Sequence, residues 1–331
     1  MTVNSPLSGK PMRVIYEPDV WPFRGKEYPY IHISYRDDEA GEQFTTDESD
    51  TACYMQATNQ YRAEFGIPYT DEIIAMRKRY GVSASKMALI LGFGTNQYRL
   101  YEMGEVPSES NGKMIRSAAN PKVFLDLVQG SRHLLSGNEY SKICSQVQTI
   151  INASESYHEE QYAISRLFRS ERGLANGFAP RSTIRLKNLL LHVLEQMGDT
   201  FQTKMNKVLF YIDFLAYREQ GMAISGLAYN AIDFGPVPQR WDRVYSAFDE
   251  VVQQPRLVFD QECVALTSDT HADMSHFTTR ELNIIDTVCA KVKDLSAHDI
   301  SELSHKEPAW QAHLHQPETI PYSEAFTIVA L

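Results

Sequence analysis

A pair of short helices broken by glycine constrains the fold of this chain more than any other feature of its sequence. Ser83 suits the N-cap position, because its hydroxyl can accept a hydrogen bond from a free N–H of the first helical turn. Apolar residues then recur at helical spacing until Gly92-Phe93-Gly94, which ends the helix, since glycine adopts positive φ angles without steric cost. A second helix is predicted from Thr95, as its N-cap, to Met103, with Gly104 as a left-handed C-terminal cap.

Polar side chains at the start of the second predicted helix suit contact with DNA bases. Two helices joined by a glycine turn are typical of the helix-turn-helix, whose second helix lies in the major groove, where Asn and Gln pair with adenine and Arg with guanine. Residues 77–99 include five basic and no acidic side chains, in a chain of net charge −10, which favours phosphate contact. The alternative is a plain helical hairpin with a solvated basic edge. We predict DNA contacts from Lys86, Thr95, Asn96, Gln97 and Arg99.

The run from Leu91 to Pro107 resembles the DNA-binding domain of MqsA-type antitoxins, a branch of the Cro/repressor-type helix-turn-helix proteins. The motif Tyr101-Glu102-Met103-Gly104 matches the end of that family's recognition helix. The family has an arginine immediately before its Tyr-Glu pair, whereas this chain has Leu100 there. The resemblance implies a five-helix, Cro/repressor-type DNA-binding bundle over residues 71–129.

The first 70 residues favour a small antiparallel sheet followed by a helix over residues 50–65. Runs of β-branched and aromatic residues predict strands at 12–16, 30–35 and 42–45. MqsA-type proteins commonly open with a zinc ribbon built on Cys-x-x-Cys, and the corresponding run here is Ser5-Pro6-Leu7-Ser8-Gly9. Because serine supplies no thiolate, the resemblance implies a ribbon-like β segment over residues 1–70 that lacks zinc.

The C-terminal part of the chain is predicted to be mainly helical. Residues 130–180 are interpreted as a helical connector, and two wide apolar stripes then indicate buried helices, the second of them capped by Thr203. Gly235-Pro236-Val237-Pro238 is rigid, because proline fixes φ and lacks an N–H. The fold class is therefore mainly α, of the α+β type. Further predicted elements are helices at 111–118, 122–127, 139–152, 159–170, 183–197, 203–216, 239–250, 280–293 (capped by Thr279) and 297–306, and a hairpin of strands 256–259 and 263–267.

Three separated motifs resemble the Panacea (SocA-like) domain. They are Lys204-x-x-Lys207-x-Leu209-x-Tyr211, Ala231-Ile-Asp-Phe-Gly-Pro-Val237 and Ser304-His-Lys-Glu-Pro-Ala-Trp310. The resemblance implies a toxin-neutralising domain over residues 181–331, in which His305 and Glu307 are expected to brace the 235–238 turn. The residues assigned to toxin binding or to the domain's motifs are Lys204, Lys207, Tyr211, Phe234, Gly235, Pro236, Val237, Trp241, His305, Glu307 and Trp310.

Together the two resemblances imply the antitoxin of a type II toxin–antitoxin pair, with a cognate protein toxin and operator DNA as partners and a homodimer as the DNA-binding form. Two alternatives remain, a proteolytic adaptor that delivers a toxin to a protease and a transcriptional regulator without a toxin. No nucleophile, base and orienting residue occur at recognisable spacing, and no cofactor or metal motif is complete, so we predict no enzyme activity, cofactor or metal. With no apolar run long enough to span a membrane and no signal-peptide features at residues 1–10, a cytoplasmic location is predicted.

Overall fold

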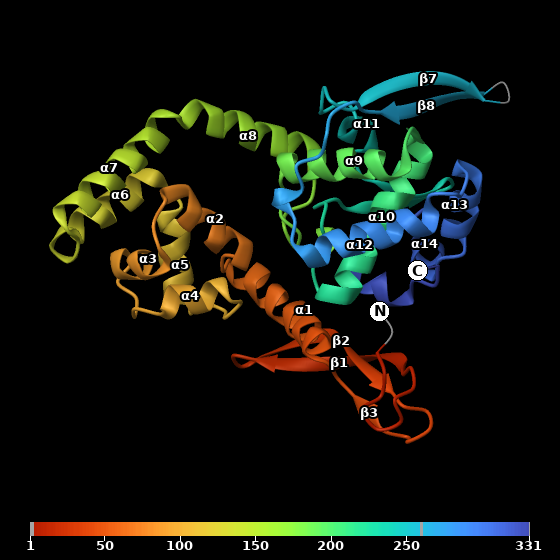
Figure 1. Cartoon of the computed structure of the whole chain (residues 1–331), viewed down its shortest axis with the longest axis horizontal. Helices are drawn as coiled ribbons and strands as arrows, with labels where there is room; N and C mark the ends of the chain where they lie inside the picture. The colour runs from red at the N-terminus through yellow and green to blue at the C-terminus, as the bar shows by residue number, and fades with distance from the viewer. Residues whose placement is uncertain (1–2, 259–260, 331) are drawn as a thin grey trace. The chain divides into compact units, whose positions relative to one another are not determined.

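The computed structural model of the chain describes residues 3–258 and 261–330. It is mainly helical, with an antiparallel sheet near the N-terminus and two small sheets in the C-terminal part (Figure 1), which confirms the predicted α+β fold class. The chain forms two compact units, Met1–Ala57 with Tyr162–Leu331, and Thr58–Gln161. Helices α1 (Asp47–Phe65) and α8 (Ser154–Leu167) contribute to both. The finer division of the chain remains a prediction, with segments 1–70, 71–129, 130–180 and 181–331.

The predicted N-terminal sheet is present, with strands longer than expected. Strands β1 (Arg13–Phe23) and β2 (Lys26–Arg36) form an antiparallel hairpin, and β3 (Gln43–Phe44) pairs with the end of β2. The two turn residues, Arg24 and Gly25, have φ angles of 51° and 80°. Positive φ at both positions lets a two-residue turn match the twist of the strands that it joins.

Two turns of matching geometry order the ends of this sheet. The Ser5 hydroxyl accepts hydrogen bonds from the N–H groups two and three residues later, at 3.0 and 3.2 Å. The Asp37 carboxylate does the same at 2.9 and 3.1 Å, and each turn closes on a glycine of positive φ, Gly9 at 70° and Gly41 at 74°. The hydroxyls of Ser5 and Ser8, with the backbone donors, hold the pKa of Asp37 well below its usual range. Hydrogen bonds therefore order the segment that the resemblance aligns with a zinc ribbon.

Helix α1 covers the edge of β2 that faces away from β1, and it confirms the helix predicted over residues 50–65. The Gln56 side-chain amide accepts a hydrogen bond from the N–H of Ile31 and donates one to its carbonyl, both at 3.0 Å. The Cys53 sulfur accepts the N–H of Ile33 at 3.4 Å. These side chains supply the hydrogen bonds that a neighbouring strand would otherwise provide, so this part of the sheet edge is satisfied.

The unit Thr58–Gln161 contains five helices in the segment for which a helix-turn-helix bundle is predicted. In its core Tyr80 stacks on Phe124 with 3.9 Å between ring centroids, and the Tyr98 hydroxyl donates to the carbonyl of Ile73 at 2.8 Å. Its helices are α2 (Thr70–Tyr80), α3 (Ala84–Ile90), α4 (Gln97–Glu102), α5 (Glu109–Ala118), α6 (Pro121–Gly130), the 3₁₀ helix η1 (Arg132–Leu134) and α7 (Gly137–Asn152).

One of the two predicted caps around the glycine corner is correct. Ser83 caps α3, since its hydroxyl accepts the N–H three residues later at 3.2 Å. The prediction that Thr95 caps the second helix is wrong, because α4 begins only at Gln97. The Gln97 N–H donates to the carbonyl of Gly94 at 2.9 Å, so Thr95 lies in a turn that precedes the helix.

In the other unit, α10 (Gln202–Gln220) is the central helix, and every residue from Met205 to Tyr217 is buried. It contacts α12, α13 and β6 (Figure 1). No helix within residues 3–258 and 261–330 combines the length and the apolar character needed to cross a bilayer. The other elements of this unit are η2 (Leu174–Asn176), α9 (Thr183–Met197), β4 (Thr200–Phe201), β5 (Tyr229–Ile232), β6 (Gly235–Pro238), α11 (Trp241–Val244), β7 (Val252–Val258), β8 (Gln261–Thr267), η3 (Met274–His276), α12 (Thr279–Val292), α13 (Ala297–His305), α14 (Pro308–His313) and η4 (Tyr322–Thr327).

The helix predicted over residues 239–250 is wrong beyond its first turn. Only α11 is helical there, and the chain then leaves the helical path so that Tyr245 and Phe248 can be buried. The Tyr245 hydroxyl donates to the side-chain oxygen of Asn206 on α10 at 2.6 Å. Contacts with a distant part of the sequence therefore override the local helical pattern.

Two predicted caps in this unit are also wrong. Thr203 does not cap α10, because strand β4 runs directly into the helix and places Phe201 at the N-cap. Helix α12 begins one residue earlier than expected, with Thr278 rather than Thr279 as its cap. The predicted 256–267 hairpin is present as β7 and β8, although position 259 lies outside the described residues.

Candidate functional site

The three C-terminal motifs, far apart in sequence, meet around the β5–β6 hairpin. Strand β6 contacts α10 and α13, and β5 contacts α14. The indole N–H of Trp310 donates to the carbonyl of Ile232 at 2.9 Å. A Cβ atom on Gly235 would lie 2.7 Å from Lys207 Cε and 2.6 Å from Ser304 Oγ, so only glycine fits at this position. Packing against this hairpin therefore brings the three motifs together.

Two lysines of the first motif have opposite surroundings. Lys204 Nζ donates to the carbonyls of Lys293 and Leu295, at 2.8 and 2.6 Å, and so satisfies carbonyls at the end of α12. Lys207 is fully buried, and its Nζ has no hydrogen-bond partner within the part of the chain that the structure describes. Burial lowers the pKa of Lys207 to about 8, because a charged ammonium is unfavourable in a low-dielectric interior.

Glu307 holds residues 329 and 330 rather than the 235–238 turn. Its buried carboxylate accepts the N–H groups of Val329 and Ala330 at 2.8 and 3.2 Å. Burial raises the pKa of Glu307, and burial together with the Glu307 charge raises the pKa of Tyr211. His305 stacks on Trp310 with 4.5 Å between ring centroids. The expectation that His305 and Glu307 brace the turn is therefore wrong, and Lys207 and Ser304 occupy that place.

Asp213 is a structural residue that the sequence analysis misses. Its fully buried carboxylate accepts hydrogen bonds from the N–H groups of Ile224 and Ser225, at 2.9 and 2.8 Å, from the Ser225 hydroxyl, and from the Tyr229 hydroxyl at 2.6 Å. Burial raises the pKa of Asp213. A single carboxylate within the apolar stripe of α10 is the signal that could have identified this residue.

Most motif residues build the core and leave little for a partner to touch. Gly235, Pro236 and Val237 are buried. Two of the assigned side chains are the exceptions, because Phe234 at the tip of the hairpin is 71% exposed and Trp241 on α11 is 41% exposed. These two aromatic residues, at opposite ends of β6, are the assigned positions best placed for contact with another protein.

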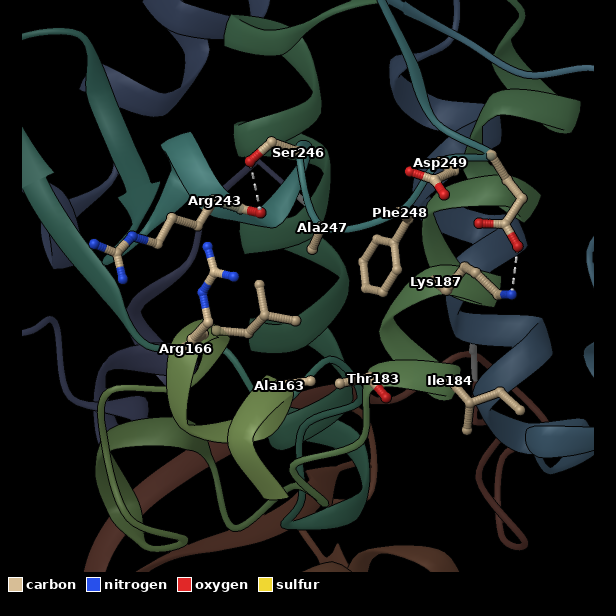
Figure 2. A pocket seen from close by; sticks show the side chains of 12 residues that line it. Ala163, Arg166, Thr183, Ile184, Lys187, Arg243, Ser246, Ala247, Phe248 and Asp249 are labelled. Atoms are coloured by element: carbon tan, nitrogen blue, oxygen red, sulfur yellow. Dashed lines mark hydrogen bonds and ion pairs between the residues drawn. The ribbon is translucent and has the colours of Figure 1, made fainter. Parts of the chain in front are cut away.

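A groove of about 510 Å³ lies beside α11, between the end of α8 and the start of α9 (Figure 2). None of its residues is among the motif residues assigned from the sequence. Arg166 and Arg243 lie at one end of the groove, and at the other Lys187 Nζ pairs with Glu250 at 2.6 Å (Figure 2). The groove is lined by Ala163, Arg166, Leu167, Thr183, Ile184, Lys187, Arg243, Ser246, Ala247, Phe248, Asp249 and Glu250.

The residues assigned to DNA contact lie on α3, on α4 and in the turn before α4. Thr95, Asn96 and Arg99 are exposed. Lys86 forms an ion pair with Glu139 at 2.5 Å, and the Gln97 amide donates to Glu105 at 3.1 Å.

The Lys86–Glu139 ion pair thus compensates part of the positive charge of residues 77–99. Another basic residue of the 77–99 segment, Arg77, pairs with Glu102 at 2.5 Å and joins α2 to α4. The assigned side chains that stay exposed on this surface are therefore Thr95, Asn96 and Arg99.

A comparison with known protein families finds a match in the C-terminal region. The family model described as antitoxin SocA-like, Panacea domain, matches residues 205–311. This range includes Asp213, the β5–β6 hairpin, the whole of the third motif and all of the first except Lys204, but not the predicted helix-turn-helix. Neither the curated proteins nor the solved structures include a match to this chain.

Proposed function

We propose that this chain is an antitoxin that neutralises a protein toxin by direct binding through the unit that carries the Panacea-like region. The match of residues 205–311 to an antitoxin domain carries the proposal. The burial of the motif residues supports a scaffold role for them, with specificity in the exposed side chains around the scaffold. Phe234 and Trp241 are the first candidates, because exposed aromatic residues often anchor protein interfaces.

Growth rescue tests this function. The gene beside the antitoxin gene is expressed from an inducible promoter, alone and together with the full chain. We expect growth arrest by the neighbour alone, rescue on co-expression, and co-purification of the two proteins. Inhibition by purified antitoxin without protease and ATP supports direct binding, whereas a requirement for both supports an adaptor. A neighbour that neither arrests growth nor binds the chain overturns the proposal.

We further propose that the unit Thr58–Gln161 binds operator DNA as part of a homodimer. The support is the helix–glycine turn–helix arrangement of α3 and α4, with Asn96 and Arg99 exposed at the start and on the surface of α4. Two copies related by a two-fold axis would read half-sites about one helical turn apart.

Substitution of these two side chains separates DNA binding from toxin neutralisation. We expect Asn96→Ala or Arg99→Ala to weaken binding to the promoter by roughly 5- to 150-fold, the loss typical of one base contact. Growth rescue should remain, because both residues lie outside the unit with the Panacea-like region. Lys122→Ala, on α6, serves as the control for loss of an exposed positive charge. Promoter binding unchanged in both variants would contradict the DNA-binding proposal.

A further inference from the structure

We propose that the groove beside α11 receives a segment of the toxin that carries an acidic side chain next to a bulky apolar one. This inference rests on the proposed antitoxin function and adds the place and chemistry of contact. The groove belongs entirely to the unit with the Panacea-like region, and its residues come from α8, α9 and the chain from Arg243 to Glu250.

The walls and floor of the groove supply the apolar part of the recognition. Leu167 and Phe248 present buried side chains, and Ile184, on the first turn of α9, is 46% exposed. An exposed isoleucine beside a concave apolar surface gains stabilisation when a partner removes it from water. A volume of about 510 Å³ accommodates a few side chains, so the occupant is a protruding segment rather than a whole domain.

The end of the groove next to α8 carries positive charge that the chain balances only in part. Arg166 has no carboxylate within ion-pair distance among the residues that the structure describes, and the nearest to Arg243 is Asp242 at 4.0 Å. Figure 2 shows the two guanidinium groups on the same side of the groove. A carboxylate at this end of the groove would accept charge-assisted hydrogen bonds from the guanidinium groups.

The arginine end is held in place by a neighbouring arginine. Arg240 donates to the backbone carbonyls of Ser165 and Arg166, at 3.2 and 2.5 Å, and so links the C-terminal end of α8 to the segment that precedes α11. Positive charge at this helix end also complements the helix dipole. The backbone that carries Arg166 is therefore held against the segment before α11 in the absence of a ligand, which lowers the entropic cost of binding.

The opposite end of the groove carries the Asp249 carboxylate beside a Lys187–Glu250 ion pair (Figure 2), and this negative charge sets the direction of the segment. Lys187 and Glu250 form an ion pair at 2.6 Å, which lowers the pKa of Glu250. The acidic side chain would therefore lie at the arginine end, away from the Asp249 carboxylate, with the apolar one over Ile184. Trp241, exposed on the same helix as Arg243, extends the surface beyond the groove and favours a protein over a small anion.

Charge reversal in the full chain tests the groove with the neighbour-encoded toxin as the probe. We expect Arg166→Glu and Arg243→Glu each to weaken toxin binding at least about tenfold, and the double variant about a hundredfold. Ile184→Asp provides a second test that leaves folding intact, because an acidic residue suits the first turn of a helix. Lys122→Glu with Lys291→Glu gives a control of equal charge change on exposed lysines elsewhere.

Restoration of binding to the double variant by an acidic-to-basic substitution in the toxin would establish the contact directly. A double variant that binds the toxin as tightly as wild type overturns the groove proposal but leaves the antitoxin function standing. A change in self-association of the double variant, without loss of toxin binding, overturns it in favour of a second copy as occupant. Absence of toxin binding by the wild-type chain overturns both proposals.

Discussion

Lys207 lies in an environment that is unfavourable for a charged side chain. Its ammonium group is buried without a hydrogen-bond partner among the described residues, next to Gly235 and Ser304. Because one pKa unit corresponds to about 1.4 kcal/mol, the change from 10.5 to about 8 amounts to roughly 3 kcal/mol of lost stability. This loss is fully present below pH 8 and is relieved as the pH rises toward 10.5, since the unfolded state then binds more protons than the folded state.

Replacement of this lysine by a neutral side chain should therefore stabilise the protein. We expect Lys207→Met to raise the free energy of unfolding at pH 7 by up to about 3 kcal/mol and to flatten its rise between pH 8 and pH 9.5. Urea denaturation at pH 7, 8 and 9.5 measures these free energies of unfolding. Lys291→Met, on the exposed face of α12, is the control. Destabilisation at pH 7 by Lys207→Met, with an unchanged pH profile, would show instead that the ammonium has a partner in solution.

At the scale of secondary-structure elements, the approach of α1 to the end of α10 depends on a single glycine. Gly221 follows α10 with a φ of +68°, and a Cβ atom there would lie 2.7 Å from the carbonyl oxygen of Ala52 and 2.9 Å from Met55 Cβ. Neither contact can be relieved by rotation of a flexible side chain. The N-terminal segment of α1 can therefore pack against this corner only if the position has no side chain.

Gly221→Ala should therefore lower the free energy of unfolding by more than the strain of a positive φ alone would. Gly81→Ala is the matched control, because Gly81 ends α2 in the same left-handed conformation, with φ of 65° and ψ of 29°, and has nothing within 4 Å of its Cβ position. We expect Gly221→Ala to lower the free energy of unfolding by roughly 2 kcal/mol more than the control does. Equal losses in chemical denaturation would mean that α1 and α10 separate easily at this corner.

At the scale of the whole molecule, one unit is built from two separate parts of the chain, and the other unit, Thr58–Gln161, lies between them in the sequence. Residues from both ends of the sequence share the unit that carries the Panacea-like region, as the packing of Tyr16 against Phe326 at 5.3 Å illustrates. The unit Thr58–Gln161 has its own hydrophobic core, built around Tyr80, Tyr98 and Phe124. Such a core is what an independently folding domain requires.

A fragment of residues 58–161 should therefore fold alone. We expect it to be helical and to unfold in one cooperative thermal transition, as followed by circular dichroism. The fragment 183–331 should be less stable than the same region in the full chain, because it loses the contacts of Gly221 and Phe326 with the N-terminal segment. A fragment 58–161 without a cooperative transition would mean that its core depends on the rest of the chain.

Sequence alone determined the fold class and most of the helices. The α9 boundaries agree with the prediction because a regular apolar stripe and a serine cap, Ser182, both act within a few residues. The Ser83 cap and the left-handed Gly104, with a φ of 110°, follow from local chemistry in the same way. The motifs that resemble the Panacea domain could be recognised because residue type and order carry that signal.

Only the tertiary structure decided which of these residues are accessible and what they contact. The segment after Trp241 has a helical pattern, yet burial of Tyr245 against Asn206 ends the helix after one turn. The groove could not be foreseen, because α8, α9 and α11 are distant in sequence and meet only after folding. Local propensities act over a few residues, whereas burial and charge pairing depend on contacts across the whole unit. These contacts decide which residues are buried in the core and which stay exposed.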